Sequence, residues 1–282
     1  MTQYGSQYGA AAGGPPTCPR HPDQITYVRC QRCNRPVCPQ CQRPAAVGVQ
    51  CVDCVAAQAK STPRIRTIAG GRARGGKPYV TYTIIGLCLI MYAGQMMTRD
   101  VASNLMFVPV LGQFEPWRFL TAAFLHGSIP HIMFNMYALY IVGPMLEKAL
   151  GVWRYVALYV LSAIGGSVAV TLFANPTSQA WITGTVGASG AVFGLFAALA
   201  LTMRRVKRSE TQILILIAIN FAIGFILPAI SWQAHLGGFL TGGLLGVIYL
   251  FSPRKSRTMF AVVGTVGVTV VLGVLAMINY SF

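Results

Sequence analysis

The sequence predicts an all-α polytopic membrane protein preceded by a small Cys- and His-rich domain. Two observations lead to this prediction. The chain is 54% hydrophobic and carries charge on only 10% of its positions, whereas an ordinary soluble domain is about 25% charged. Seven of the eight cysteines fall between residues 18 and 54. We therefore expect most of the chain to lie in lipid and the cysteines to mark a separate unit.

Four parts are expected along the chain. Residues 1–17, rich in Gly, Gln, Tyr and Pro, predict a disordered tail, and they have neither the basic start nor the apolar core of a secretory signal. The Cys-rich module spans 18–54. A basic linker spans 55–78, too polar to enter a bilayer and too rich in Gly to hold a helix. Residues 79–282 form the membrane domain.

The membrane domain contains seven apolar runs. A bilayer core of about 30 Å requires around 20 residues of helix, and each run approaches that length. The runs span 79–97, 131–150, 153–173, 186–203, 211–229, 232–251 and 258–279. We therefore expect seven transmembrane helices.

Charge gives the orientation of these helices. The chain has 22 Lys and Arg against six Asp and Glu, a net charge of +16. In a soluble protein this excess would suggest nucleic-acid binding, but in a membrane protein basic residues collect in the cytoplasmic loops. The loops after the second, fourth and sixth runs hold "EKALGVWR", "MRRVKRSE" and "SPRKSR", whereas "NPTSQAWITGT" and "PAIS" on the other side carry no charge. This pattern predicts a cytoplasmic N-terminus and a C-terminus outside.

The connection at 98–130 is long and rich in apolar residues. Its charges balance, since it contains two acidic and two basic side chains. We expect it to lie partly in the membrane interface with Trp117 at the level of the headgroups. A soluble-style amphipathic loop is the alternative.

Ser189 lies among small residues in "TVGASGAVFG". Taken alone, such a stretch favours close helix packing, and a catalytic serine is the second interpretation. The position of His235 favours the catalytic interpretation of Ser189. Both residues are expected about one turn inside runs that travel in the same direction, so they would share one depth near the outer surface. Gly238, Gly242 and Gly246 line the same face of the helix as His235 and permit close approach.

A serine that hydrogen-bonds an imidazole is an activated nucleophile. The acidic residue nearest to the spans, Glu147, is expected at the opposite end of its helix, so the sequence predicts a Ser–His dyad without an acidic third member. His131 and Asn135, four residues apart in "HIMFN", lie on one helical face at the same depth. With the Ser189 N–H they could stabilise an oxyanion. Alternatively, His131 and Asn135 only form hydrogen bonds between helices.

These motifs resemble the rhomboid family of intramembrane serine proteases. The resemblance covers about residues 79–251, with a seventh helix as in many members. The matching pieces are "WR" at 117–118, "H" at 126, "HIMFN" at 131–135, "E" at 147, "GASG" at 187–190 and "AHLGGFLTG" at 234–242.

The resemblance implies a serine endopeptidase that cleaves single-span membrane proteins near the outer leaflet of a bacterial plasma membrane and needs no cofactor for catalysis. Ser189 would be the nucleophile and His235 the general base and acid, with His131, Asn135 and the Ser189 N–H as the oxyanion hole. The resemblance also assigns structural roles in the first loop to His126 and to the Trp117–Arg118 pair, and at the inner face to Glu147.

One position departs from the family pattern. Some members carry a Tyr four residues after the serine that packs on the histidine, and here it is Phe193, which can stack but has no hydroxyl. The rival hypothesis is an inactive relative that binds membrane proteins and directs their trafficking. A small-molecule transporter is a second rival, although the sequence has no evident inverted repeat.

The Cys-rich module contains four pairs of potential metal ligands with two residues between the partners. This spacing lets both members of a pair bind one tetrahedral zinc ion, so eight ligands predict two structural Zn²⁺. The ligands are Cys18, His21, Cys30, Cys33, Cys38, Cys41, Cys51 and Cys54. The pairs resemble a B-box-like or other cross-braced finger, in which pairs one and three share one ion and pairs two and four the other. Sequential pairing stays open, and disulfides would require an oxidising compartment.

The role of the module is less defined by its sequence. It carries five arginines but only one aromatic residue, Tyr27, so nucleic-acid binding is not favoured. We expect it to bind a cytoplasmic protein partner or a second copy of itself. A stable cap without a partner is the alternative.

Overall fold

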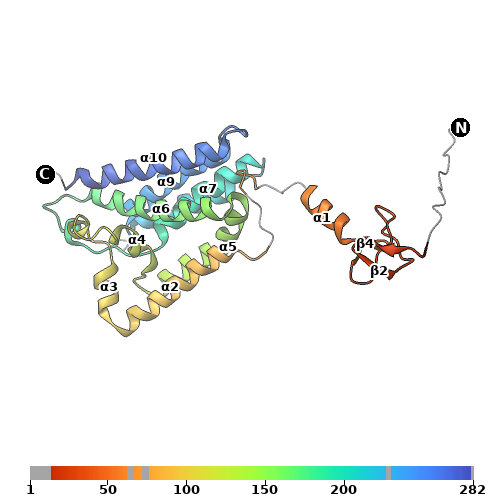
Figure 1. Cartoon of the computed structure of the whole chain (residues 1–282). Coiled ribbons are helices and arrows are strands. Elements are labelled where there is room, and N and C mark those ends of the chain that lie inside the picture. The colour runs from red at the N-terminus through yellow and green to blue at the C-terminus, as the bar shows by residue number, and fades with distance from the viewer. Residues whose placement is uncertain (1–13, 62–66, 72–75, 227–229, 281–282) are drawn as a thin grey trace. The chain divides into compact units, whose positions relative to one another are not determined.

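The computed structural model describes residues 14–61, 67–71, 76–226 and 230–280, so most of the predicted tail at 1–17 lies outside the described residues. The chain divides into two units, Met1–Arg64 and Ile65–Phe282 (Figure 1). Each is described by itself.

The first unit consists of two small antiparallel hairpins and a helix. Strand β1 (Thr17–Cys18) pairs with β2 (His21–Ile25), and β3 (Gln42–Pro44) pairs with β4 (Val49–Cys51). Helix α1 (Val52–Ser61) follows, so the chain stays helical beyond Cys54, where the sequence predicted the start of a helix-free linker. The buried cluster of this unit consists of six cysteines and Val37. So small an apolar interior cannot stabilise a domain by burial alone.

The second unit is helical. Its long elements are α2 (Tyr79–Met97), α5 (Ile129–Leu150), α6 (Val152–Phe173), α7 (Ser189–Arg205), α8 (Thr211–Ile226), α9 (Trp232–Phe251) and α10 (Arg257–Ile278). Among the described residues, five helices are long and apolar enough to cross a membrane, namely α2, α5, α6, α9 and α10. Helices α7 and α8 are shorter, at 17 and 16 residues. The expected all-α membrane fold is confirmed, and the seven helices fall on the seven predicted runs.

Helices α6, α7 and α9 form the centre of the bundle (Figure 1). In the most apolar part of α6, 61% of the residues are buried, against 17% in α2 and in α10. The exposed side chains of α2 and α10 are mainly apolar, as expected for surfaces that face lipid. The interior is therefore organised around the helices that carry Ser189 and His235.

Close approach of α7 and α9 depends on glycine. A methyl group at Gly238 would overlap the backbone of Gly190, and one at Gly242 would overlap the backbone of Gly194. The two backbones are thus in direct contact over two turns, which confirms the role predicted for the stripe on α9.

The connection at 98–130 is folded rather than irregular. It contains α3 (Arg99–Leu105), α4 (Arg118–Thr121) and two short 3₁₀ turns, η1 (Pro109–Leu111) and η2 (Ala122–Phe124). Arg118 is buried, pairs with Glu115 and donates to the carbonyl groups of Ser103 and Met106 at 2.7 and 2.8 Å. Trp117 is 51% exposed, and its expected depth at the headgroups stays a prediction.

Glu147 has the structural position that the sequence analysis expected. Its carboxylate accepts hydrogen bonds from the backbone N–H groups of Val80 and Thr81 at 3.1 and 2.9 Å, and from the Thr81 hydroxyl. These N–H groups belong to the first turn of α2, which has no intrahelical acceptor for them. Glu147 therefore caps α2 at the end of the bundle opposite Ser189. We call the two ends of the bundle the Ser189 end and the Glu147 end.

Candidate functional site: a serine and three histidines at the Ser189 end

Ser189 is the first residue of α7, not one turn inside it as the sequence suggested. The chain enters the helix through Gly187, whose φ of +133° is accessible mainly to glycine. The first N–H to bond within this helix is that of Val192, which donates to the Ala188 carbonyl at 3.0 Å. The N–H of Ser189 therefore has no intrahelical acceptor and lies at the positive end of the helix dipole. This placement suits an oxyanion donor better than the predicted one.

His235 lies one turn inside α9, as predicted. Its ring stacks on Phe193 with centroids 4.2 Å apart and planes inclined by 14°. The side chain is buried, and its Nδ1 has no hydrogen-bond partner among the described residues. Since Phe193 follows Ser189 by one turn on the same helical face, the imidazole lies against the face of α7 that begins with Ser189. The structure confirms that Phe193 can stack without a hydroxyl.

His131 borders the same position from α5. A methyl group at Gly187 would lie 2.7 Å from both Cε1 and Nε2 of His131 and 3.7 Å from the Oγ of Ser189. The imidazole edge and the serine hydroxyl are therefore neighbours across Gly187. His131 and His235 are close enough to interact electrostatically.

Asn135 is buried one turn further along α5. Its amide donates to the carbonyl of His131 at 2.9 Å, which uses one of its two N–H donors. The remaining N–H is available for a second acceptor. The structure thus places Asn135 next to His131, and its role in an oxyanion hole stays a prediction.

Two supporting residues were missed from the sequence. Gln95, near the end of α2, accepts from the His126 N–H at 3.0 Å and donates to its carbonyl at 3.2 Å. Ser128 caps α5 by accepting from the His131 N–H at 3.3 Å. The buried ring of His126 then packs edge-on against His131, with centroids 5.2 Å apart. A glutamine inside an apolar run and a serine before Ile-Pro were the available signals.

The loop before Ser189 is tied to the first connection. Phe107 and Thr185 exchange two backbone hydrogen bonds at 3.0 and 2.7 Å, and the Gly187 N–H donates to the Ala122 carbonyl at 2.9 Å. A cavity of about 20 Å³ lies beside Gly187 and Gly190, which is room for a single water molecule. The Ser189 end is therefore pre-formed by contacts from three segments.

Comparison with known proteins identifies this fold. Residues 113–252 match the rhomboid domain family. This part of the chain is therefore similar to a rhomboid domain. RHOMBOID-like protein 1 of Arabidopsis thaliana is 40% identical over 189 residues, covering 59% of this chain and 47% of that protein. Rhomboid protease GluP of Bacillus subtilis is 35% identical over 193 residues, covering 64% of this chain and 36% of that protein.

A third relative carries a similar name. Rhomboid-type serine protease 2 of Emericella nidulans is 35% identical over 151 residues, covering 51% of this chain and 29% of that protein. The chain spans about half the length of the first three curated relatives, 46 to 48%. With five apolar helices and these relatives, the protein is an integral membrane protein.

The cysteine-rich unit lies outside the residues that match the rhomboid domain. Its eight predicted ligands form two groups, and within each group the ligand atoms lie within 4.8 Å of one another. One group consists of Cys18, His21, Cys38 and Cys41, and the other of Cys30, Cys33, Cys51 and Cys54. This is the cross-braced pairing, so sequential pairing is excluded. No disulfide forms among these cysteines.

The distances in these tetrads fit a tetrahedral ion. With Zn–S bonds of about 2.3 Å, two sulfur ligands lie about 3.8 Å apart. The Sγ atoms of Cys33 and Cys51 are 3.7 Å apart. The Nδ1 of His21 lies 3.3 and 3.4 Å from the Sγ atoms of Cys38 and Cys41, against about 3.5 Å for a Zn–N bond near 2.0 Å. Either tetrad could hold a metal ion.

Backbone N–H groups favour the thiolate form in both tetrads. Hydrogen bonds from the backbone of Cys38 and Arg20 lower the pKa of Cys18 to about 6. Burial opposes ionisation of Cys30, but the backbone N–H groups of Cys51 and Cys33 outweigh it and lower its pKa to about 6. Burial raises the pKa of Cys41 to about 11. Neighbouring thiolates repel one another, so several cysteines of one tetrad ionise together only when a cation lies between them. Deprotonated cysteines around a cation are what a metal site requires.

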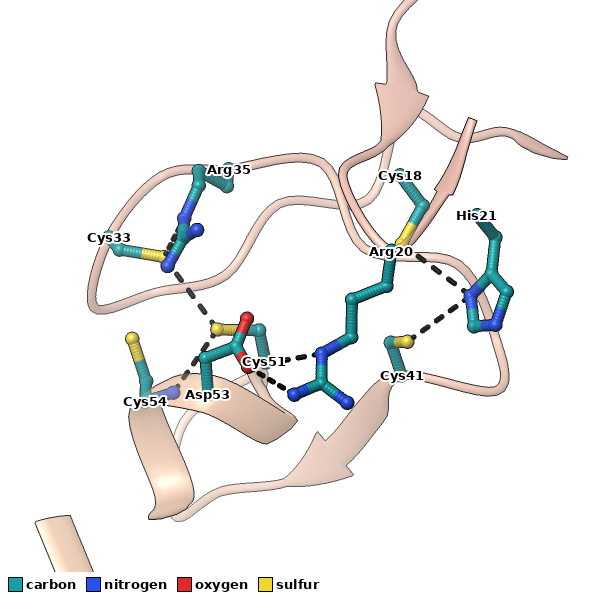
Figure 2. A network of polar contacts seen from close by, with 9 residues as sticks. All are labelled: Cys18, Arg20, His21, Cys33, Arg35, Cys41, Cys51, Asp53 and Cys54. Atoms are coloured by element: carbon teal, nitrogen blue, oxygen red, sulfur yellow. Dashed lines mark hydrogen bonds and ion pairs between the residues drawn. The ribbon is translucent and has the colours of Figure 1, made fainter. Parts of the chain in front are cut away.

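An ion pair joins the two tetrads (Figure 2). Arg20 donates from Nε and Nη2 to one carboxylate oxygen of Asp53, at 3.0 and 2.7 Å. Arg20 lies between the first two ligands of one tetrad, and Asp53 lies between the last two of the other. This exposed pair therefore connects the two segments that carry the candidate metal ligands.

Proposed function

We propose that this protein is an intramembrane serine endopeptidase that cleaves single-span membrane proteins, with Ser189 and His235 as its catalytic dyad. One observation carries the proposal: the His235 ring stacks on Phe193, one turn from Ser189, where α7 and α9 are in backbone contact. Similarity to relatives named as rhomboid proteases supports the same reaction class.

In the first half of the proposed reaction, His235 removes the proton from the Ser189 hydroxyl as Oγ attacks the scissile carbonyl carbon. The carbonyl oxygen becomes an oxyanion, which the Ser189 N–H, the Asn135 amide and the His131 imidazole stabilise by hydrogen bonds. The carbon–nitrogen bond then breaks, and His235 gives its proton to the leaving amine. The product is an acyl-enzyme.

In the second half, water attacks the acyl-enzyme while His235 accepts its proton. The ester bond to Oγ breaks, the carboxylic acid leaves and the proton returns to Ser189. No acidic residue takes part, because Glu147 is engaged in capping α2 at the other end of the bundle. No cofactor is needed for these steps.

The proposed orientation follows from the charges of the loops. The Glu147 end, with its basic loops, faces the cytoplasm together with the N-terminus, and the Ser189 end opens to the outside together with the C-terminus. Substrates would then be cut near the outer leaflet of a plasma membrane, which we take to be bacterial.

For the first unit we propose two structural Zn²⁺ ions and a role in binding a cytoplasmic protein partner or a second copy of the chain. Three cysteines and a histidine, or four cysteines, are the ligand sets that zinc prefers in closed structural sites. Its B-box-like character belongs to the same proposal.

The test of the endopeptidase uses the purified full chain, reconstituted in vesicles with a labelled single-span substrate. We expect cleavage by the natural protein, loss of cleavage in Ser189→Ala and His235→Ala, and full activity in Ser256→Ala, a matched serine at the Glu147 end. Labelling of Ser189 by a fluorophosphonate provides a second readout that does not depend on the choice of substrate.

The alternative is a catalytically inactive rhomboid-like protein that binds membrane proteins and directs their trafficking. It predicts that natural protein and Ser189→Ala bind the same membrane proteins and that neither cleaves or reacts with the fluorophosphonate. Such a result would contradict the endopeptidase proposal.

A further inference from the structure

Four arginines gather at the Glu147 end, and we call them the arginine cluster: Arg154, Arg205, Arg254 and Arg257. They come from the start of α6, the end of α7, the loop after α9 and the start of α10. Arg257 is repelled by the charges of Arg205 and Arg254, and Arg154 by that of Arg257. The four guanidinium groups therefore lie close together at this end of the bundle.

Two members of the cluster are buried without a counter-charge. Arg154 is 1% exposed and Arg257 is 8% exposed. The Nε of Arg154 has no hydrogen-bond partner among the described residues, and its Nη2 reaches only the Thr258 hydroxyl, at 3.5 Å. Arg257 donates to the carbonyl oxygens of Ser252 and Ile68 at 3.3 and 2.8 Å, which carry no full charge.

None of the six acidic side chains of the chain neutralises these arginines. All six lie in described residues, where the ion pairs are Arg20–Asp53 and Arg118–Glu115. Glu147 caps α2, and Glu210 pairs with no member of the cluster. A buried cation without a counter-charge is costly, so an anion from outside the chain would stabilise the cluster.

The surroundings of the cluster are apolar and exposed. The Arg154 guanidinium lies 4.5 Å from the ring centre of Trp153, and that of Arg205 lies 5.6 Å from the ring centre of Phe251. Trp153 is 40% exposed and Phe251 is 46% exposed. Guanidinium groups over exposed aromatic rings at helix ends are typical of the boundary between headgroups and acyl chains.

A short backbone segment forms one wall of the cluster. Residues 67–71 fold back onto the bundle, where the Ala69 N–H donates to the Ala149 carbonyl at 3.2 Å and Ala69 is fully buried. The carbonyl that Arg257 contacts belongs to this segment, and a methyl at Gly71 would lie 2.9 Å from Nη1 of Arg154. The buried arginines are thus held in place by packing, not by charge.

We propose that the arginine cluster binds the phosphate group of an anionic phospholipid in the leaflet at the Glu147 end. Guanidinium groups bind phosphate oxygens through paired, charge-assisted hydrogen bonds. The exposed Arg205 and Arg254 receive the phosphate beside Arg257, and the acyl chains lie along exposed aromatic surface such as Phe251. A free phosphate ion would offer the same phosphate oxygens to the arginines but would not contact that apolar surface.

The experiment titrates phosphatidylglycerol or phosphatidylcholine into the full-length protein in a zwitterionic detergent and counts bound lipids by native mass spectrometry. Phosphatidylglycerol is expected to bind about tenfold more tightly than phosphatidylcholine, because the arginines repel the cationic choline group that accompanies the phosphate in phosphatidylcholine. Arg205→Gln and Arg257→Gln should each remove that preference. The matched control is Arg208→Gln, an exposed arginine near the end of α7 but outside the cluster, which should keep it.

Three outcomes would overturn the proposal. Equal binding of the two lipids contradicts selection of an anionic phospholipid. An equal loss of the preference in Arg208→Gln shows that the effect comes from diffuse surface charge. Competition by inorganic phosphate at concentrations equal to those of the lipid assigns the cluster to a free ion instead. Arg257 is buried, and its replacement can disturb folding. The test of the lipid preference therefore depends on Arg205→Gln, which changes an exposed side chain. Cleavage activity does not enter this test, so it is independent of the endopeptidase proposal.

Discussion

The two units of this protein reach a defined structure by opposite means. The first has a small interior of cysteines, and its two tetrads of ligands stand where a larger domain has apolar side chains. The second has a large apolar interior, and its central helices touch through glycine backbones. The first unit offers two sets of metal ligands in place of a large apolar interior, and the second unit depends on glycines that lack side chains, so different changes should disrupt each.

The largest expected effect is metal removal. Structural zinc supplies about 10–16 kcal/mol in small finger domains, so a strong chelator should unfold residues 14–61 and leave the helical second unit intact. Metal analysis should give close to two ions per chain before treatment. Hydrogen exchange before and after chelation provides the measurement, with the amides of α7 as the internal control. Unchanged protection of the first unit would show that it folds without metal.

The next effect concerns the glycine contact in the second unit. Gly238→Ala should destabilise the helical second unit by about 3 kcal/mol, because the new methyl overlaps the backbone of Gly190. Gly267→Ala on α10 is the matched control. A methyl there meets nothing within 4 Å, so a gain of about 0.5–1 kcal/mol from helix propensity is expected. Thermal unfolding in detergent compares the two, and equal effects would refute backbone contact.

A smaller effect is expected at the cap of α2. Glu147→Gln keeps the shape of the side chain but removes the charge that faces the first turn of the helix. We expect a loss of about 1–2 kcal/mol, typical of a charged or capping group at a helix N-terminus. Glu210→Gln, which removes a loop carboxylate outside any ion pair of the described residues, should change stability little. If Glu147→Gln instead abolishes cleavage in a fully folded protein, the purely structural role of Glu147 is wrong.

The smallest effects concern the ring beneath His235. Phe193→Leu removes an aromatic contact worth about 0.5–1.5 kcal/mol, so cleavage should fall up to about tenfold through poorer positioning of the imidazole. Phe193→Tyr keeps the stacking and should stay within about twofold of the natural rate. The initial rate of substrate cleavage across pH measures both. A larger loss in the tyrosine variant than in the leucine variant would contradict the stacking role.

Much of this protein was predictable from patterns short enough to read along the chain. Seven apolar runs predicted the seven helices because a helix that lies in lipid requires continuous apolar sequence. Four ligand pairs at two-residue spacing predicted two metal sites because that spacing lets two ligands reach one ion. The Gly238 and Gly242 stripe predicted the approach of α7 and α9, which the structure confirms.

Other features depend on contacts that no local pattern encodes. From the sequence alone, the four ligand pairs could share metal ions in a cross-braced or a sequential arrangement. The positions of the ligands in space show the cross-braced arrangement. Ser189 was expected one turn inside a helix, but α7 begins at Ser189 directly after the positive φ of Gly187, which leaves the Ser189 N–H without an intrahelical acceptor. The contact of His131 with the Gly187 segment, the support of His126 by Gln95 and the clustering of Arg154 with Arg257 join residues from separate segments of the chain.

The sequence by itself determined which segments are apolar helices and which residues are candidate metal ligands and candidate catalytic residues, because hydrophobic length, ligand spacing and residue type are local properties. Only the tertiary structure decided which ligands share an ion, where Ser189 lies in its helix and which cations stay without a counter-charge. These depend on packing, which brings together groups that the chain separates by tens of residues.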